Sequence, residues 1–313
     1  MIVPRRAPDE STVSDGRVPV TDETLRLMAV HAHPDDESSK GAATAARYAA
    51  EGVDVLVVTC TGGERGDVLN PHYGPAPEGG IEGMRAVRHA EMAAAAAALG
   101  VRQHWLGFVD SGLPEGDPLP PLPAGSFAAT PLEQAAAPLV ALVRQFRPHV
   151  MTTYDPSGGY SHPDHVMCHA VSMEAWQTSG HPDRYPDAGD PWHPLKLYHD
   201  HGFSLARMRA VHDAIVAAGG ESPFSGWIDS RESREVPERP VTTRVRCDAF
   251  FPRRDAALRA HATQIDPEGW FFAVPRDLER RVWPWEEFEL AAARVPTTTP
   301  EDDLFAGIRG RLA

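Results

Sequence analysis

A short apolar run passes directly into a cluster of ionisable side chains at Leu25-Arg26-Leu27-Met28-Ala29-Val30-His31-Ala32-His33-Pro34-Asp35-Asp36-Glu37. The run 25–30 is too short for a helix and is typical of a buried strand. Residues 38–50, rich in alanine and followed by Gly52, favour a helix. Charged groups between a strand and a helix are costly to bury unless something binds them. A divalent metal is the natural candidate, because it converts repelling carboxylates and imidazoles into ligands.

A second copy of this pattern follows further along the chain. Residues 149–154 predict another strand, residues 155–160 a loop, and His162-Pro163-Asp164-His165 opens a helix that extends to about residue 179. Proline suits a first helical turn and aspartate complements the positive helix start, so either copy alone could be an ordinary helix N-terminus. Two copies after two strands favour a shared site over coincidence.

Composition limits the class of protein. A chain of 313 residues with 42% hydrophobic and 24% charged residues is typical of a globular protein of one large or two modest domains. The net charge of −14 disfavours nucleic acid and anionic membranes as partners. There is no apolar run of membrane-spanning length and no signal-peptide pattern. The cysteines Cys60, Cys168 and Cys247 lack CxxC spacing, which indicates reduced thiols and a cytoplasmic protein.

The alternation of predicted strands and helices indicates an α/β fold with a mostly parallel sheet and helices on both faces. Further strands are expected at 53–60, 103–108, 195–199 and 241–247, and further helices at 81–99, 205–218 and 253–265. Thr130-Pro131-Leu132-Glu133 predicts a capping box for a helix that buries Leu132 and ends before Pro148. Residues 283–290 predict a docked helix. We expect a flexible arm at 1–24, a catalytic core at 25–194, and a smaller α+β portion at 195–313 that packs on the core and completes the substrate site.

Ligands of such sheets bind beyond the carboxyl ends of the strands. Both His-Pro-Asp units, the loop 61–67 and Asp110 follow predicted strands, so we expect them to meet at one edge. The loop 61–67 is neither GxGxxG nor a P-loop, which disfavours a nucleotide site.

The residue types at this edge suit amide hydrolysis. A catalytic zinc site has about three protein ligands and an open position, and it lowers the pKa of a water that it binds to about 7. The candidate ligands are His33, Asp36 and His165. Asp35, adjacent to Asp36 but pointing elsewhere, can take a proton and return it to a leaving amine. His162 can donate to an oxyanion, and Asp164 can orient an imidazole.

The motifs resemble those of the PIG-L/LmbE-like zinc N-deacetylases. Besides the two His-Pro-Asp units, longer segments are similar to one branch, the mycothiol S-conjugate amidases, and the resemblance extends from Leu25 to about Gly307. These segments are 30–41, 61–66, 105–114, 154–155, 158–160 and 260–266. The resemblance implies a Rossmann-like fold and hydrolysis of the amide that joins N-acetylcysteine to glucosaminyl-inositol.

The resemblance also implies a role for each matching residue. Metal ligands fall at His33, Asp36 and His165, the general base at Asp35, and the oxyanion-stabilising imidazole at His162. Asp164 would support that imidazole, and Tyr160 would lie near the reacting carbonyl. Arg88 and Asp110 match positions that hold sugar or inositol hydroxyls in relatives. The remaining positions expected to contact substrate are Lys40, Glu64 and His261. One Zn²⁺ per chain is implied, and Fe²⁺ suits the same donors.

Several alternatives stay open at this stage. The small-molecule substrate could be a thiol conjugate, in detoxification or in natural-product processing, or it could be N-acetylglucosaminyl-inositol, which a deacetylase would hydrolyse. A metal- or sugar-binding module without turnover is a third possibility. The sequence does not indicate whether the chain forms a homo-oligomer.

Overall fold

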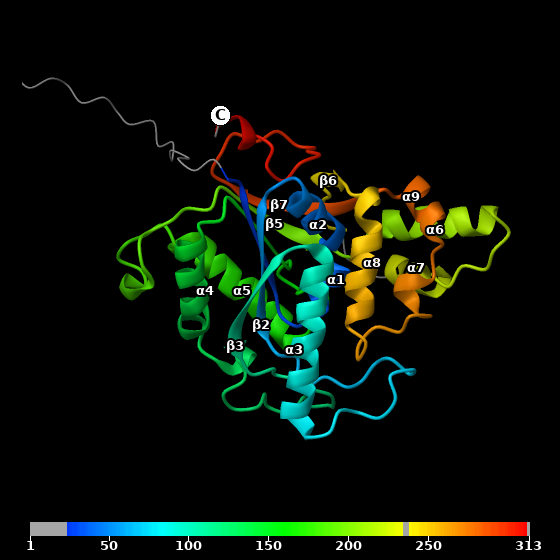
Figure 1. Ribbon diagram of the computed structural model, residues 1–313, viewed down its shortest axis with the longest axis horizontal. Coiled ribbons are helices and arrows are strands. Elements are labelled where there is room, and N and C mark those ends of the chain that lie inside the picture. The colour runs from blue at the N-terminus through cyan, green and yellow to red at the C-terminus, as the bar shows by residue number, and fades with distance from the viewer. Residues whose placement is uncertain (1–23, 234–237, 312–313) are drawn as a thin grey trace, which may run out of the picture.

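The computed structural model describes residues 24–233 and 238–311 (Figure 1). The flexible arm expected at 1–24 lies outside the described residues, except for Thr24. A seven-stranded sheet has the strand order β3-β2-β1-β4-β5-β7-β6. Its strands are β1 (Arg26–His31), β2 (Asp54–Thr61), β3 (Arg102–Phe108), β4 (Val150–Thr153), β5 (Lys196–His201), β6 (Thr243–Arg246) and β7 (Trp285–Ala293).

The first five strands run parallel, and β7 and β6 pair antiparallel at one side. This confirms the predicted α/β fold with a mostly parallel sheet. No helix among the described residues is long and apolar enough to cross a membrane.

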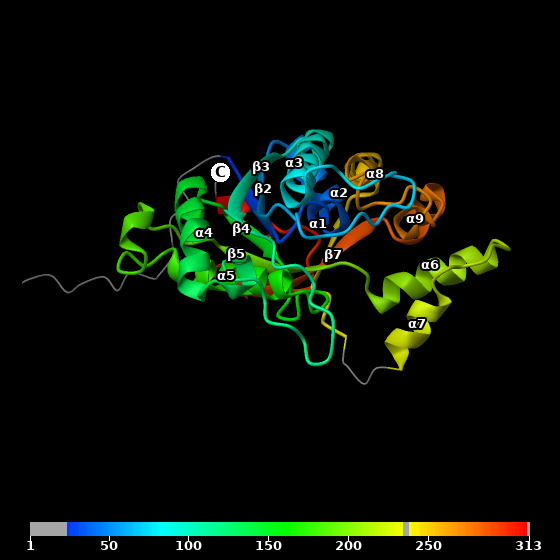
Figure 2. The same ribbon diagram turned by 90° about the horizontal axis from the view of Figure 1, so that it is seen from below.

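Helices cover both faces of the sheet, as predicted (Figure 2). The main helices are α2 (Ala42–Ala50), α3 (Gly80–Leu99), α4 (Leu132–Phe146), α5 (Pro163–Thr178), α6 (Leu205–Ala217), α7 (Ser225–Glu232), α8 (Phe251–Ala260) and α9 (Arg276–Val282). Because side chains alternate along a strand, Met28 and Val30 of β1 face the core under α4 and α5, whereas Leu27 packs with the α2 side. Burial on both faces explains why this strand reads as a continuous apolar run.

The strand order reverses beside β1. The chain passes from β1 to β2 and β3 on one side, then returns to place β4 on the other side of β1. Such a reversal opens a crevice at the carboxyl ends of the two central strands. The two His-Pro-Asp units follow β1 and β4, so the topology delivers both to the same crevice.

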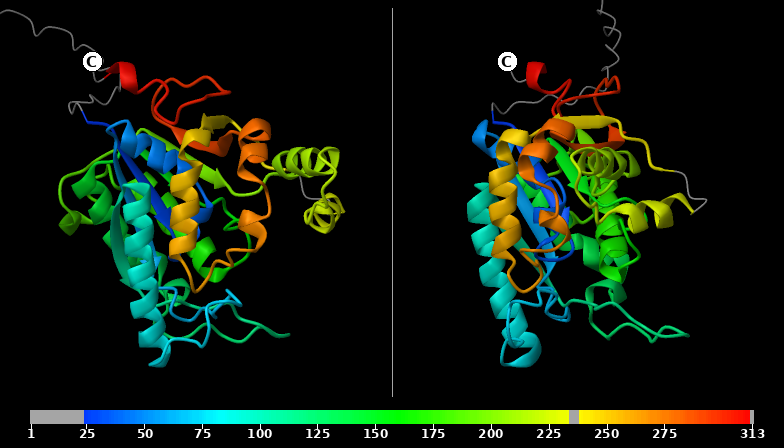
Figure 3. Two further views of the ribbon diagram at one scale, coloured as in Figure 1. Left: turned by 45° about the vertical axis from the view of Figure 1, so that its right-hand side comes forward. Right: turned by 90° about the vertical axis from the view of Figure 1, so that its right-hand side faces the viewer.

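The C-terminal portion extends the sheet of the core. Strands β5, β7 and β6 continue the same hydrogen-bonded sheet, and β5 is parallel to β4. Helices α6 and α7 project from the body on the side where β5 ends (Figure 3). The segment after β5 therefore leaves the sheet next to the crevice.

The prediction of a docked helix at 283–290 is wrong, because β7 begins at Trp285 and includes residues 285–290. Successive side chains of a strand point to opposite faces, and each of the adjacent residues Glu286 and Glu287 finds a partner on its own side. Glu286 accepts the N–H groups of Ala43 and Thr44 at the start of α2, and Glu287 accepts the Ser204 hydroxyl at 2.6 Å. Pairing with β5 and β6 overrides the local preference.

Several helix predictions need correction at their ends. The helix expected at 38–50 is broken into α1 (Asp36–Ser39) and α2, because Gly41 takes a left-handed conformation with φ of 72°. Thr130 does not cap α4, since its hydroxyl donates to the Ser126 carbonyl. Leu132 is 42% exposed rather than buried. The helix expected at 253–265 ends at Ala260, and the short helices α7 and α9 were not predicted.

We predict that a buried ion pair stabilises the attachment of the C-terminal segment to β5. The ammonium of Lys196 lies 2.5 Å from Glu301, which also accepts the Tyr198 hydroxyl at 2.8 Å, and Lys196 is fully buried. Lys196→Met should lower the free energy of unfolding in urea by about 3–5 kcal/mol, because it strands a buried carboxylate.

The matched control is the double variant Lys196→Met with Glu301→Leu, which removes both charges. It should be more stable than the single variant. A loss below about 1 kcal/mol in the single variant would show that the pair resembles an exposed one.

Candidate metal centre and active site

Two loops bring the candidate ligands together. His33 lies in the turn after β1 and Asp36 opens α1, whereas His162, Asp164 and His165 form the first turn of α5 after β4. Proline at the start of α5 fits the expectation for a first helical turn. The first unit differs, because Pro34 lies in a turn before α1 and not in the helix.

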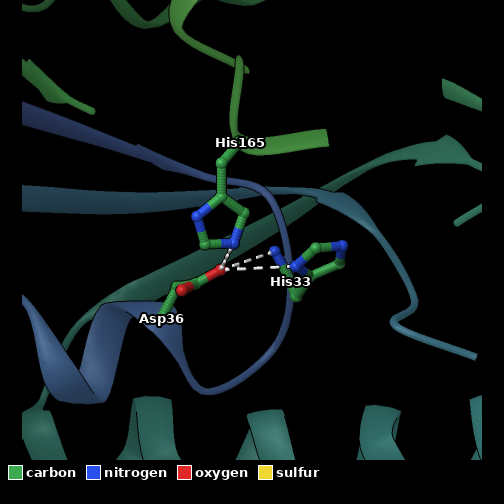
Figure 4. Close-up of side chains that lie close together, drawn as sticks. All are labelled: His33, Asp36 and His165. Atoms are coloured by element: carbon green, nitrogen blue, oxygen red, sulfur yellow. Dashed lines mark hydrogen bonds and ion pairs between the residues drawn. The ribbon is translucent and has the colours of Figure 1, made fainter. Parts of the chain in front are cut away.

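His33, Asp36 and His165 converge as a compact buried group (Figure 4). One carboxylate oxygen of Asp36 lies 3.3 Å from Nε2 of His165 and 3.6 Å from Nδ1 of His33. Each of the three residues offers one potential ligand atom that lies within 4.8 Å of those of the other two. The expectation that these widely separated residues are close enough to share one ion is confirmed. Two imidazoles and one carboxylate suit Zn²⁺ or Fe²⁺.

The His165 ring is oriented for a metal. Its Nδ1 lies 2.9 Å from the Gly158 carbonyl oxygen, which fixes the proton on that nitrogen. Its Nε2 is buried, points at Asp36, and has no hydrogen-bond partner among the described residues. A buried nitrogen lone pair is costly unless it is bound, so the residues present fit a cation.

His33 presents Nδ1 to the group because carboxylates occupy its other nitrogen. Nε2 of His33 lies 3.3 Å from Asp164 and 3.6 Å from Asp110. Asp164 is itself fixed by the N–H groups of Ser111 and Ala128. Burial opposes protonation of His33, but hydrogen bonds to these carboxylates outweigh it and raise its pKa well above the ordinary value. The Asp164 carboxylate thus contacts His33, and one potential ligand atom from each of His33, His162 and Asp164 lies within 4.8 Å of the other two. The family resemblance implied that Asp164 supports His162.

His162 is a neutral hydrogen-bond donor beside the group. The ring is buried, and its Nδ1 accepts the backbone N–H of Asp164 at 3.1 Å, so the proton lies on Nε2. Burial, together with the nearby charge of His33 and His165, lowers its pKa to about 4. The geometry supplies a neutral N–H at the edge of the site.

Asp35 points away from Asp36 and is held in a strained backbone conformation. Its φ is 105°, which is rare for a residue with a side chain. Its carboxylate lies 2.9 Å from the guanidinium of Arg88, and its backbone N–H donates to Glu37 at 2.9 Å. Burial raises the pKa of Asp35, and the charge of Arg88 opposes this rise. The strain is therefore sustained by two specific contacts.

Arg88 is buried and makes contacts inside the protein. Its guanidinium is buried and donates to the carbonyls of Gly63 and Pro34 as well as to Asp35. A Cβ on Gly63 would lie 2.3 Å from this guanidinium, so glycine is needed there for the close approach. In this structure Arg88 positions Asp35.

Three other predicted substrate contacts are also engaged inside the protein. His261 is 0% exposed and lies 2.7 Å from Glu37, which in turn receives the Asp35 N–H. Glu64 accepts the Arg85 guanidinium at 2.6 Å. Asp110 accepts the N–H groups of Arg65 and Gly112. These residues shape the loops around the site, and their side chains do not line its cavity.

Lys40 and Tyr160 do face the cavity. The Lys40 ammonium lies 2.8 Å from Asp36, and Tyr160 is 54% exposed with its ring 4.6 Å from the His165 ring. Both residues line a cavity of about 520 Å³.

Sequence reasoning did not assign roles to two further residues. The Tyr154 hydroxyl accepts the Ala32 N–H at 2.9 Å, and its ring stacks on His165 with centroids 4.4 Å apart. Asp200 is buried at the end of β5 and lines the cavity. Both lie at strand ends, which is the one signal that could have found them.

The fold and this group together define a hydrolase of the amidase/deacetylase type with a buried His/Asp candidate metal site. The chain belongs to the PIG-L/LmbE family. The family model described as GlcNAc-PI de-N-acetylase matches residues 28–176. A mycothiol S-conjugate amidase of Streptomyces coelicolor is 56% identical over 91% of this chain and 98% of that protein.

Other relatives carry a different activity or show the fold alone. A 1D-myo-inositol 2-acetamido-2-deoxy-alpha-D-glucopyranoside deacetylase of Geodermatophilus obscurus is 40% identical over 91% of this chain and 98% of that protein. The crystal structure of the conserved protein TT1542 from Thermus thermophilus has a TM-score of 0.54 and 22% identity, covering 88% of this chain and 98% of that one. The latter similarity supports the fold and not an activity.

We predict that Gly158→Ala weakens metal binding. A Cβ at this position would lie 2.6 Å from Cβ of His165, and φ of 74° is already unfavourable for alanine. Displacement of His165 should lower metal affinity about 10- to 100-fold, as loss of ligand-orienting contacts does elsewhere.

Gly159→Ala is the matched control. Gly159 has nearly the same φ of 76°, but a Cβ there meets nothing within 4 Å. Titration with Zn²⁺ against a competing chelator should separate the two variants, and equal affinities would contradict the proposed role of His165.

Proposed function

We propose that this protein hydrolyses the amide bond of mycothiol S-conjugates and releases an N-acetylcysteine S-conjugate and glucosaminyl-inositol. The observation that carries this proposal is the buried group of His33, Asp36 and His165 beside Asp35 and His162, in a chain with 56% identity to a mycothiol S-conjugate amidase. Detoxification of electrophiles and processing of a natural-product intermediate would both use this reaction.

One Zn²⁺ per chain, or Fe²⁺ with the same donors, would be held by His33, Asp36 and His165. A divalent cation there would supply Lewis acidity to a carbonyl oxygen and to water. The carboxylates of Asp164 and Asp110 behind His33 support this assignment, because such contacts orient imidazole ligands.

Asp35 would take the proton of the attacking water and pass it to the leaving amine. Its carboxylate is adjacent to the group but turned toward Arg88, which leaves Asp36 alone to face the imidazoles. The raised pKa of Asp35 favours proton uptake, and Arg88 keeps the carboxylate in place.

His162 would donate its Nε2–H to the oxyanion that develops on the carbonyl. The hydrogen bond from the Asp164 backbone to Nδ1 fixes the required tautomer. Tyr160, on the exposed side of His165, would lie near the reacting carbonyl, and Lys40 would contact substrate at the cavity mouth.

We further propose a cytoplasmic location. The thiols of Cys60 and Cys168 are both free and buried with their sulfur atoms 3.7 Å apart, an arrangement suited to a reducing compartment.

We predict that Asp35→Ala abolishes hydrolysis of a mycothiol adduct while metal content is retained. Loss of a positioned acid/base group typically lowers kcat by about 10²–10⁴-fold. An assay of amine release measures hydrolysis, and metal analysis of protein purified without chelators measures the metal content. Asp67→Ala is the control, because Asp67 is an exposed carboxylate outside the metal group. Retained turnover in Asp35→Ala would remove this residue from the mechanism.

The deacetylase activity of the Geodermatophilus relative makes N-acetylglucosaminyl-inositol the second candidate substrate. We predict amine release from the bimane adduct of mycothiol at a kcat/KM at least about tenfold above that from the acetylated pseudodisaccharide. Release from the pseudodisaccharide alone would make the protein a deacetylase.

A further inference from the structure

The cavity beside the candidate metal centre has two chemically different walls. The cavity has a volume of about 520 Å³ and is lined in part by Lys40 and Tyr160. Lys40 contacts Asp36, and Tyr160 contacts His165, so the cavity lies next to the metal group. A bound acyl group placed at the metal group would extend directly into it.

One wall is aromatic and comes from the C-terminal portion. Phe203 follows β5, Trp227 lies on α7, and Phe271 lies in the turn before α9. The rings of Phe203 and Phe271 have centroids 6.0 Å apart, and all three side chains are half-buried. A hydrophobic cluster that includes Met208 and Phe224 packs behind Phe203 and Trp227. The wall is thus supported and presents apolar surface to the cavity.

The other wall is polar and contains an unsatisfied carboxyl group. Asp200 is 5% exposed, and neither of its side-chain oxygens has a hydrogen-bond partner among the described residues. Burial raises the pKa of Asp200 to about 8, despite the opposing effect of the Lys40 charge. An unpaired buried polar group is costly, so a ligand that hydrogen-bonds Asp200 would recover this cost.

We propose that this cavity binds the acyl half of the substrate, with the S-substituent against Phe203, Trp227 and Phe271 and the acetamido group near Asp200. This inference rests on the proposed function and deepens it. The wall then determines which thiol adducts are processed.

The chemistry of the two substrate halves favours this assignment. The glucosaminyl-inositol half carries hydroxyl groups around both rings, whereas the S-substituent of an adduct can be a large apolar group. Burial of an apolar group against three aromatic rings contributes in proportion to the area removed from water. The acetamido group, common to all adducts, offers one N–H and one C=O for Asp200.

Trp227→Ala tests the aromatic wall. For the bimane adduct of mycothiol, kcat/KM should fall about 10- to 100-fold, whereas for the S-methyl adduct it should stay within about twofold of wild type. Unchanged turnover of the S-methyl adduct also shows that the variant is folded. Phe271→Ala should behave in the same way.

Phe272→Ala is the matched control. Phe272 is a half-buried neighbour of Phe271, but its ring packs under the guanidinium groups of Arg259 and Arg276, outside the cavity. It should leave the ratio of kcat/KM for the two adducts unchanged.

The outcomes separate this inference from the proposed function. If Trp227→Ala lowers kcat/KM equally for both adducts, or for neither, the aromatic subsite is overturned while the amidase activity of the wild-type protein stands. Failure of wild-type protein to hydrolyse either adduct overturns the proposed function and this inference with it.

Asp200→Leu tests the polar wall independently. Because the acetamido group is shared, KM should rise about tenfold or more for both adducts alike, the change that 1.4 kcal/mol of lost binding gives. An unchanged KM for both adducts would contradict the placement of the acetamido group beside Asp200.

Discussion

The buried contact of one carboxylate with two imidazoles is the constraint on which this structure depends. Asp36 is buried where it meets His33 and His165, and its interactions with His165 and with the ammonium of Lys40 outweigh burial and hold the pKa of Asp36 well below its ordinary value. Such a group can exist only where β1 and β4 are neighbours, because each strand delivers one side of it. The reversal of strand order and the chemistry of the site are therefore one feature of the fold.

The surroundings of this group show how a strained site is maintained. Asp35 adopts an unfavourable backbone conformation, and the guanidinium of Arg88 and the carboxylate of Glu37 hold it there. Each support is itself fixed, since Arg88 lies against Gly63 and Glu37 is paired with the buried His261. Glycines at two loops permit close approaches that any side chain would block. The loops are thus part of the site although they donate no metal ligand.

The sequence predicted the parts of this site that are local. A strand followed by His-Pro-Asp, repeated once, located five of the side chains that converge, because parallel strands present their carboxyl ends at one edge. It did not predict partners that come from distant segments. Arg88 and His261 were expected to contact substrate, and the structure shows in addition that they hold Asp35 and Glu37 inside the protein. A helix was expected at 283–290, yet sheet pairing and the contact of Glu286 with the start of α2 favour a strand there.

An amidase named for mycothiol S-conjugates and a deacetylase named for an acetamido sugar are both similar to this chain over nearly their whole length. For the two candidate substrates that we propose for this chain, the part that would differ is the acyl group, which is an acetyl group in one and an S-substituted N-acetylcysteinyl group in the other. A metal group that meets only the shared amide would not distinguish them. A structure that distinguishes them must do so on the acyl side, where β5 ends and α6 to α9 follow. Because these elements contribute aromatic side chains to the cavity that Lys40 and Tyr160 also line, the subsite that we propose would let the C-terminal portion alter substrate choice without disturbing the candidate ligands that follow β1 and β4.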